Sequence, residues 1–524
     1  MDHSAASSGS VPRKATRREW IGLGVIALPC LLYSMDLTVL NLAVPAIMAD
    51  LNPSATQLLW IVDIYGFMIA GMLITMGTLG DRIGRRKLLM IGAFAFGLAS
   101  ILAAFSTSAE MLIVARAILG LSAATLAPST LSLISNMFPD PKERTFAIGV
   151  WISSFSAGGA IGPVIGGILL TWFWWGSVFL IAVPVMVVLL IVAPFLLPEY
   201  RDENAGRIDL VSVALSLATI YGIKHAASYA FDGEAAIAIL GGLAIGFVFV
   251  LRQSRLATPL IDLSLFKSLK FSASLGINTL GFFAAFGIFL LTAQYLQLVL
   301  GLSPLAAGLW GAPSSIGFIV GSLLSPKLLA AMRPGYVMAG GYALTAVSFV
   351  VMPQAAAAGS LYLLVVSHLL MSFGLAPIFT LSTDLIIGTV PPERAGTAAG
   401  LSETSAEFGG ALGIAILGSI VTALYAGSMV AFDGSGLAAD ALANARATIG
   451  GAVAEAVEVG GATGELLLDA ARTAYADAFY VVTLVCAVVS LLAAVVSLLV
   501  LGRIKPDAGD TSDAKECGAE AMAP

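Results

Sequence analysis

Long apolar runs follow one another along almost the whole chain and are separated by short polar segments. Fourteen of them approach the roughly 20 residues that a helix needs to cross a bilayer core. They show no period-two alternation, so they predict membrane-spanning helices and not the strands of a barrel. The expected spans are 20–46, 57–79, 88–106, 110–135, 145–170, 175–197, 209–227, 235–252, 272–299, 304–330, 335–354, 360–386, 396–425 and 478–502. The pattern therefore predicts an all-α integral membrane protein.

The positive charges indicate how these spans are oriented. With the N-terminus inside, 22 of the 26 Lys and Arg residues fall on inner segments. Lys224, Arg446 and Arg472 fall outside, and Arg116 lies within the fourth span. This asymmetry follows the positive-inside rule and predicts an even number of spans with both termini in the cytoplasm. An error of one span would reverse every later loop, so the regularity also supports the count.

Composition excludes several classes of function. Charged residues make up 11% of the chain, against roughly 25% in a soluble domain, so a cytosolic enzyme is not expected. The net charge of −6 gives no basic surface for nucleic acid. No Gly-Lys dipeptide is present, so no phosphate-binding loop of an ATP-driven pump is expected. Three Cys and three scattered His predict neither a metal site nor a cofactor.

A long outer segment, 426–477, interrupts the spacing of the spans. It carries seven acidic residues, and its stretches 437–458 and 464–476 are predicted to be helical with a break at Gly460-Gly461. It is either a lid packed on the outer face or a gate that attracts cations. The predicted units are a cytoplasmic tail 1–18, a six-helix half 19–198, two extra helices 199–254, a second six-helix half 255–505 and a disordered cytoplasmic tail 506–524.

Three motifs stand out within the first half. Residues 77–88 read Gly-Thr-Leu-Gly-Asp-Arg-Ile-Gly-Arg-Arg-Lys-Leu, in which glycines allow a tight turn and Asp81 can pair with the bases. Arg116, four residues before Gly120, would cost at least about 3 kcal/mol unpaired in the membrane, so it needs a partner inside the bundle. Small residues four apart in 158–167 give a smooth helix face. Each motif also has a plainer interpretation. Residues 77–88 can be an ordinary positive-inside loop, Arg116 a structural arginine, and residues 158–167 an ordinary helix-packing surface.

Together these motifs resemble those of the major facilitator superfamily, and the GxxxGPxxGG form of 158–167 resembles the antiporter motif of its drug exporters. Segments 35–45, 60–65 and 402–409 are similar to the fourteen-span drug:proton antiporters, especially the dye and quaternary-ammonium exporters. The resemblance covers about residues 18–505. It implies a major facilitator fold with fourteen helices, namely two six-helix halves and two extra helices between them. The motif residues to which it assigns conformational roles are Gly77, Asp81, Arg82, Gly84, Arg85, Gly158, Gly162, Pro163, Gly166 and Gly167.

The resemblance also implies a function. It predicts a bacterial cell-membrane antiporter, driven by protons and not by ATP, that exports lipophilic, mostly cationic drugs, dyes and quaternary ammonium compounds by alternating access. A monomer in contact with membrane lipids is expected. The chain departs from the family in one place: the span 304–330 has no acidic residue, which puts a preference for divalent cations in doubt.

Intramembrane carboxylates are the candidates for proton coupling, because desolvation favours their neutral form. Asp36 lies about 24 Å along the first span from Trp20. Glu403 and Glu407, four residues apart, share one helix face, where two negative charges repel. Arg116 is expected to modulate a partner carboxylate. Structural hydrogen bonding is the alternative role for each of these residues.

Further acids and aromatics are candidates for binding a cationic substrate, because aromatic faces attract cations. They are Asp63, Tyr65, Trp151, Phe282, Phe286, Phe289, Tyr295, Trp310 and Phe379, together with Glu403 and Glu407. Packing or lipid contact is the alternative for the aromatics. Two rival functions stay open: a dedicated exporter of one metabolite or antibiotic, and a membrane sensor or scaffold that transports nothing.

Overall fold

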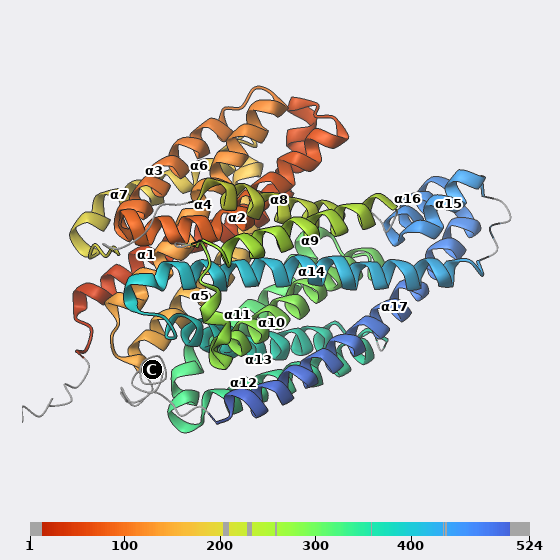
Figure 1. The fold of residues 1–524 in the computed structure, drawn as a ribbon. Coiled ribbons are helices and arrows are strands. Elements are labelled where there is room, and N and C mark those ends of the chain that lie inside the picture. Colours follow the sequence, from red (N-terminus) through yellow and green to blue (C-terminus); the bar gives the residue numbers. More distant parts are fainter. Residues whose placement is uncertain are drawn as a thin grey trace, which may run out of the picture.

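The computed structural model describes residues 13–202, 209–227, 233–256, 259–357, 359–432, 434 and 437–503. Within this part of the chain every regular element is a helix, and Figure 1 shows the helices gathered into one elongated bundle. The first group, called the N-half, consists of α1 (Arg17–Leu51), α2 (Ala55–Ile83), α3 (Arg85–Ala104), α4 (Ala109–Met137), α5 (Pro141–Trp172), the short α6 (Ser177–Leu180) and α7 (Ala182–Leu196).

The remaining helices form a second group and six connecting elements. The C-half consists of α10 (Leu269–Gln294) with η2 (Tyr295–Val299), α11 (Pro304–Ala331), α12 (Pro334–Ala357), α13 (Leu361–Ile387), α14 (Ala395–Met429) and α17 (Gly461–Val496) with η4 (Ser497–Leu501). The connecting elements are α8 (Leu210–Ala227), α9 (Gly233–Gln253), η1 (Leu263–Lys267), η3 (Pro392–Arg394), α15 (Ala439–Ala447) and α16 (Ile449–Val459).

Twelve helices in the described residues are long and apolar enough to cross a membrane. The expected spans 209–227 and 235–252 correspond to α8 and α9, whose apolar stretches within the described residues are shorter, Leu210–Thr219 and Leu240–Gln253. An all-helical bundle with twelve candidate spans is therefore established, and the count of fourteen stays a prediction. The predicted tail 506–524 lies outside the described residues.

The two halves meet mainly along α5 with α11 and α2 with α14, and also along α4 with α14 and α5 with α13. Inside the N-half, α1 packs on α5 and α2 on α4, while in the C-half α10 packs on α14 and α11 on α13. Helices α8 and α9 pack on each other, and α8 also contacts α2 and α14. Figure 1 shows this pair running alongside α14, at the boundary between the halves.

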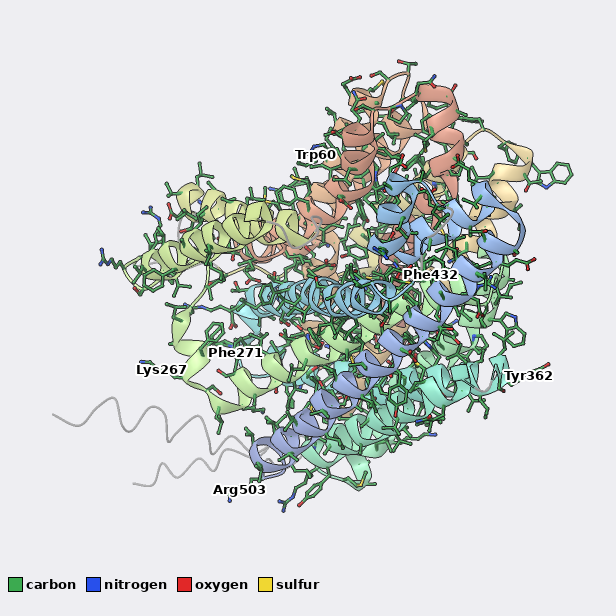
Figure 2. All side chains as sticks on the ribbon, turned by 90° about the vertical axis from the view of Figure 1, so that its right-hand side faces the viewer. Trp60, Lys267, Phe271, Tyr362, Phe432 and Arg503 are labelled. Carbon is green, nitrogen blue, oxygen red and sulfur yellow. The ribbon has the colours of Figure 1, made fainter. Side chains whose placement is uncertain are left out.

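The two ends of the bundle differ in charge. One end holds Arg85, Arg144 and Arg394 near the first residues of α3, α5 and α14, and we call it the basic end. The opposite end, where α15 and α16 lie with Asp440, Glu455 and Glu458, is called the acidic end. Figure 2 looks onto the acidic end and shows Phe432 between Trp60 of the N-half and Tyr362 of the C-half.

The contact between α1 and α5 depends on the glycines of the 158–167 motif. A Cβ atom at Gly158 would lie 2.1 Å from the carbonyl oxygen of Leu31, and one at Gly162 would lie 2.3 Å from Oγ1 of Thr38. The α1 backbone therefore approaches α5 more closely than any side chain would allow. This contact positions the part of α1 that carries Asp36.

The outer segment differs in detail from the sequence expectation. The predicted helix 437–458 is two helices, α15 and α16, because Thr448 adopts an extended conformation and its side chain accepts a hydrogen bond from the Gly451 N–H at 3.0 Å. The break at Gly460-Gly461 is present, with φ angles of 62° and 57°. The predicted helix 464–476 is not separate from the last span: both belong to α17, because no turn residue interrupts its alanine-rich sequence.

Large apolar side chains cover much of the surface. Trp172, Phe195 and Leu210 are 77%, 73% and 77% exposed. A soluble protein would bury such groups, whereas hydrocarbon chains solvate them.

Candidate functional site

A buried ion pair lies inside the N-half. Nη1 of Arg116, on α4, lies 2.5 Å from Oδ2 of Asp36, on α1. The arginine side chain is completely buried, and its Nε–H donates to the carbonyl of Ile61 at 3.1 Å. Arg116 thus has the partner that its depth in the membrane requires, and the partner is a residue that the sequence singled out independently.

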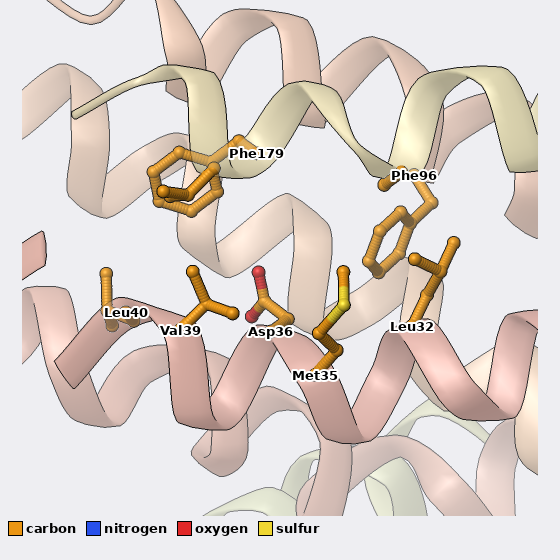
Figure 3. Close-up of a pocket in the computed structure, with 9 residues that line it drawn as sticks. Leu32, Met35, Asp36, Val39, Leu40, Phe96 and Phe179 are labelled. Carbon is orange, nitrogen blue, oxygen red and sulfur yellow. The ribbon is translucent and has the colours of Figure 1, made fainter. Parts of the chain in front are cut away.

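The space beside Asp36 is very small. A cavity of about 10 Å³ lies between α1 and the helices that carry Phe96 and Phe179, and Asp36 lines it together with Met35 and Val39. Figure 3 shows the Asp36 carboxylate directed away from α1 into this space. Such a volume holds about one water molecule. The space beside this carboxylate therefore has room for a water molecule and not for a drug-sized cation.

A line of aromatic residues leads from the ion pair to the other half. The Tyr65 ring, on α2, lies 4.6 Å from Cζ of Arg116, which is a cation–π contact. Tyr65 and Tyr33 have ring centroids 6.3 Å apart. The Tyr33 hydroxyl, on α1, donates to Oε1 of Glu407 at 2.8 Å. The contacts therefore run from Asp36 through Arg116, Tyr65 and Tyr33 to Glu407 on α14, and we call these five residues the polar chain.

Glu403 and Glu407 lie one turn apart on α14, and both are only partly buried. Aromatic rings of the C-half lie beside this segment: a Cβ atom at Gly410 would be 3.2 Å from the Phe286 ring. Phe286 continues into a cluster in which Phe282 stacks on Phe379 at 4.1 Å. Two carboxylates and an aromatic surface are thus placed at the boundary between the halves.

The other predicted binding residues lie in different surroundings. Trp151 is 2% exposed and donates to Oγ1 of Thr130 at 2.9 Å, but it reaches Tyr33 indirectly through edge contacts with Phe155. Two of the other aromatic residues pack on neighbouring rings: Tyr295 stacks on Phe479, and Trp310 contacts Tyr362 edge-on. The last two residues are exposed: Phe289 lies beside His368, and Asp63 lies on α2. A substrate role for these residues stays a prediction.

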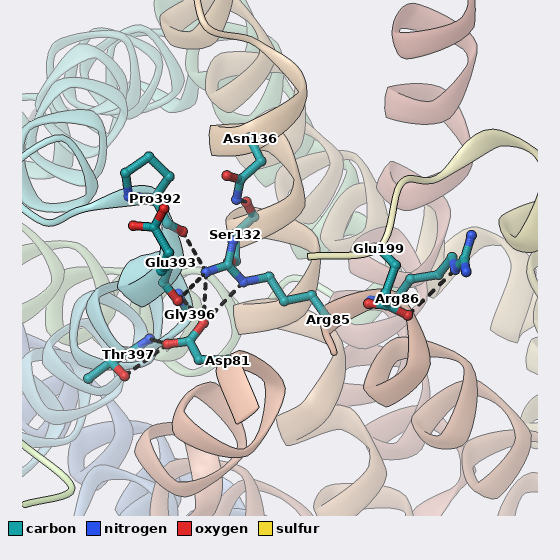
Figure 4. Close-up of polar contacts among 10 residues, drawn as sticks. All are labelled: Asp81, Arg85, Arg86, Ser132, Asn136, Glu199, Pro392, Glu393, Gly396 and Thr397. Atoms are coloured by element: carbon teal, nitrogen blue, oxygen red, sulfur yellow. Dashed lines mark hydrogen bonds and ion pairs between the residues drawn. The ribbon is translucent and has the colours of Figure 1, made fainter. Parts of the chain in front are cut away.

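At the basic end, Asp81 joins the two halves. Its carboxylate accepts from the N–H groups of Gly396 and Thr397 at 2.9 and 2.8 Å, and from the Thr397 hydroxyl at 3.0 Å. It also pairs with Arg85 at 2.8 Å, and Arg85 donates to the carbonyls of Pro392 and Glu393. Figure 4 shows these contacts, which we call the Asp81 cluster. Because α2 and α3 belong to one half and α14 to the other, the Asp81 cluster holds the basic end closed.

A second contact closes the same end. Asp384, on α13, accepts from Nε of Arg144 at 2.7 Å and from the Thr145 hydroxyl at 2.6 Å. Both donors lie at the start of α5, so this contact also crosses between the halves. All three residues have low exposure, which strengthens a charge-assisted hydrogen bond.

The remaining residues of the 77–88 motif support the close approach. A Cβ atom at Gly77 would lie 2.4 Å from the Gly396 carbonyl oxygen. Gly84 has a φ of 108°, and a Cβ atom there would meet the Glu199 carboxylate at 2.7 Å. Arg82 is exposed. The glycines therefore serve backbone geometry, and the buried charges make the contacts between the halves.

Several residues of these contacts were not predicted as site residues, among them Tyr33, Arg144, Thr145, Asp384 and Thr397. Tyr33 precedes Asp36 by three residues, so helical spacing alone places it on a neighbouring face of α1. Nothing local distinguishes Asp384 from an interfacial acid, because its partners are about 240 residues away.

Comparison with known proteins agrees with this geometry. The sequence family described as the Major Facilitator Superfamily matches residues 26–414. The multidrug efflux pump LfrA of Mycolicibacterium smegmatis is 43% identical over 87% of this chain and 91% of its own length. The methyl viologen resistance protein SmvA of Salmonella typhimurium is 34% identical over 87% and 93%. The tetracenomycin C resistance and export protein of Streptomyces glaucescens is 33% identical over 77% and 76%.

Solved structures share the fold. The human organic anion transporter MFSD10 superimposes with a TM-score of 0.61 at 14% identity, covering 90% of this chain and 99% of its own. A bacterial homologue of the lysosomal transporter Spinster, in an inward-facing and unoccupied conformation, gives 0.54 at 19%, covering 93% and 98%. The resemblance indicated by the motifs is thus confirmed, and the protein is a multi-pass membrane protein. The chain belongs to the Major Facilitator Superfamily.

Proposed function

We propose that this protein is a proton-coupled antiporter that exports lipophilic, mostly cationic drugs, dyes and quaternary ammonium compounds by alternating access. The relatives named as multidrug pump and methyl viologen resistance protein support the substrate class. The observation that carries the proposal is the polar chain, because it joins an acid in the N-half to an acid in the C-half.

The two ends of the polar chain suit two different ligands. Asp36 adjoins a space of one water molecule, so it suits a proton. Glu403 and Glu407 are partly exposed beside aromatic rings, so they suit an organic cation. Two carboxylates one turn apart repel each other when both are charged, and either a proton or the substrate can supply the compensating positive charge. Mutual exclusion of proton and drug at this pair couples the two fluxes.

The contacts at the basic end fit one state of an alternating-access cycle. By the positive-inside rule the basic end faces the cytoplasm of a bacterial cell, with both termini on that side. The Asp81 cluster and the Asp384 contact then close the site to the cytoplasm. We infer that α8 and α9 complete fourteen spans, and that the protein works as a monomer without a cofactor.

A proteoliposome assay tests the coupling. Ethidium-type dye movement is measured under an imposed pH gradient, with and without a membrane voltage, for the wild type, Asp36→Asn and Glu407→Gln. Both variants are expected to lose gradient-driven efflux, which is measured per amount of folded protein because Asp36→Asn removes the charged partner of the buried Arg116. Glu110→Gln is the matched control, because Glu110 is an exposed acid at the other end of α4 from the closed contacts. Full efflux in both variants would refute the assignment.

The comparison of efflux with and without a membrane voltage reports how many protons are exchanged for each cation. Exchange of one proton for one monovalent cation moves no net charge and ignores voltage. Two protons per cation add one net charge, worth about 2.3 kcal/mol per 100 mV, so voltage alone would then drive efflux.

A dedicated exporter is the second candidate, favoured by the resemblance to the tetracenomycin C export protein. A panel of cationic dyes, quaternary ammonium compounds and tetracenomycin C separates the two. Efflux of one compound alone would support the dedicated exporter, and efflux of chemically unrelated cations would support the multidrug pump.

A further inference from the structure

A second cavity lies at the acidic end of the N-half, away from the polar chain. It has a volume of about 460 Å³, within the usual range for small-molecule pockets. One wall comes from the last turns of α1, and the other from the end of α5 and the connection that follows it. The residues used in the argument are Pro45 and Asp50 on the first wall and Phe173, Trp174 and Trp175 on the second.

The aromatic wall is held in place by hydrogen bonds. Trp175 is 6% exposed, and its Nε1–H donates to Oδ2 of Asp50 at 2.7 Å. Trp174 donates from Nε1 to the carbonyl of Ala104 at 3.2 Å and packs against Phe105 with ring centroids 5.8 Å apart. The two indoles therefore do not need to reorganise before a ligand binds, and preorganisation favours affinity.

Asp50 gives the cavity a negative charge, although an acidic residue at this end of α1 does not stabilise the helix. It lies in the last turn of α1, where the helix dipole is negative and a cation would be the stabilising residue, yet that turn contains no base. In the described part of the chain no Lys, Arg or His lies within ion-pair distance of it. The outer arginines Arg446 and Arg472 instead bond to carbonyls of the C-half. Within the described residues, Asp50 is exposed and accepts one hydrogen bond from Trp175, but it has no cationic partner, so it places a negative charge beside three aromatic rings.

We propose that this cavity is an outer binding site for lipophilic monovalent organic cations, separate from Glu403 and Glu407. The choice of ligand rests on the proposed export function, and substrate released at the acidic end would occupy the site. Aromatic faces and a carboxylate together select an organic cation over a metal ion or a neutral compound. A zwitterionic lipid headgroup fits less well, because the described lining contains no base to pair with its phosphate.

Binding to the full-length protein in phosphatidylglycerol nanodiscs tests the site, with tetraphenylphosphonium as the probe. The Glu403→Gln/Glu407→Gln background removes the central carboxylates, so the remaining binding reports the outer cavity. In this background Asp50→Asn is expected to weaken binding at least fivefold, and Trp174→Ala about three- to thirtyfold. Trp172→Ala is the matched control, since this neighbouring indole is 77% exposed and does not line the cavity. Unchanged binding in Asp50→Asn and Trp174→Ala would overturn the proposal.

A second experiment measures how well the ligand protects a cysteine in the cavity from labelling, and it leaves the aromatic residues of the wall unchanged. Ala46 is exposed and lines the cavity, so an Ala46→Cys thiol should be shielded from an impermeant maleimide by tetraphenylphosphonium, whereas a Trp172→Cys thiol should not. Equal labelling of Ala46→Cys with and without the probe would contradict the site. Protection by phosphatidylethanolamine nanodiscs alone, with no further effect of the probe, would assign the cavity to a lipid headgroup and overturn the proposal. Because no proton gradient is used, these results are independent of the efflux assay.

Discussion

Asp81→Asn is expected to shift the protein towards a state that is open at the basic end. Asp81 makes two kinds of contact: the ion pair with Arg85 lies within the N-half, and three hydrogen bonds reach Gly396 and Thr397 in the C-half. Only the second kind is broken when the halves separate. The opening equilibrium therefore depends on those three bonds, and not on the ion pair itself.

The expected size follows from the geometry. Asparagine keeps one acceptor oxygen and replaces the other by an NH2 group, which cannot accept from a backbone N–H. One or two of the three bonds are then lost. A hydrogen bond to a charged group contributes about 1.5–3 kcal/mol. Because the asparagine regains part of the lost bonding, the free energy of opening should fall by about 1.5–3 kcal/mol. That corresponds to about a 10- to 150-fold change in the equilibrium. Arg85 keeps its bonds to the carbonyls of Pro392 and Glu393, so closure is weakened and not abolished.

Distances between spin labels measure this equilibrium directly. Labels are placed at Lys87 on α3 and Lys327 on α11, which are exposed and belong to different halves. Asp81→Asn is expected to increase the population at longer distances. Glu199→Gln is the control, because the Arg86–Glu199 pair at 3.6 Å is about one-third exposed and lies within the N-half. The Glu199 carboxylate also accepts from the backbone N–H groups of Arg86 and Lys87. These contacts stabilise the start of α3 within the N-half, so their loss should not affect opening.

The same distance distribution in Asp81→Asn, Glu199→Gln and the wild type would contradict the role of Asp81 in closing the basic end. Thr397→Val provides an intermediate case, since it removes only the hydroxyl bond and should produce a smaller shift in the same direction.

Three further predictions concern individual contacts. Gly158→Ala forces a methyl group against the α1 backbone and should destabilise the fold by about 1–3 kcal/mol, seen as less folded protein after heating, whereas Gly167→Ala meets nothing within 4 Å and should be harmless. Tyr33→Phe removes the hydrogen bond that links α1 to Glu407 in the other half, so gradient-driven efflux should fall while the amount of folded protein stays the same; wild-type efflux would exclude a role for this contact. Arg116→Lys cannot keep both the ion pair and the Nε bond, so it should lower gradient-driven efflux and stability in denaturant, and wild-type behaviour would contradict the cation–π geometry.

The local features of the fold follow closely from the sequence. Helix positions depend on continuous apolar runs and on capping residues such as Ser54 and Ser108, which act over a few residues. The twelve candidate spans therefore appear where the apolar pattern placed them. The boundaries of α15, α16 and α17 were less predictable, because alanine-rich polar segments give no strong periodicity.

The sequence by itself also marked Asp36, Arg116 and Glu407 as exceptional, since a charged group within an apolar run is costly enough to need a partner or a function. Only the tertiary structure decided which groups became partners. Tyr33 and Glu407 are 374 residues apart, and Arg144 and Asp384 are 240 apart, so no helical periodicity relates them. Their contacts arise because close packing along α2–α14 and α5–α11 brings the halves together, and this packing depends on the shapes of whole helix faces.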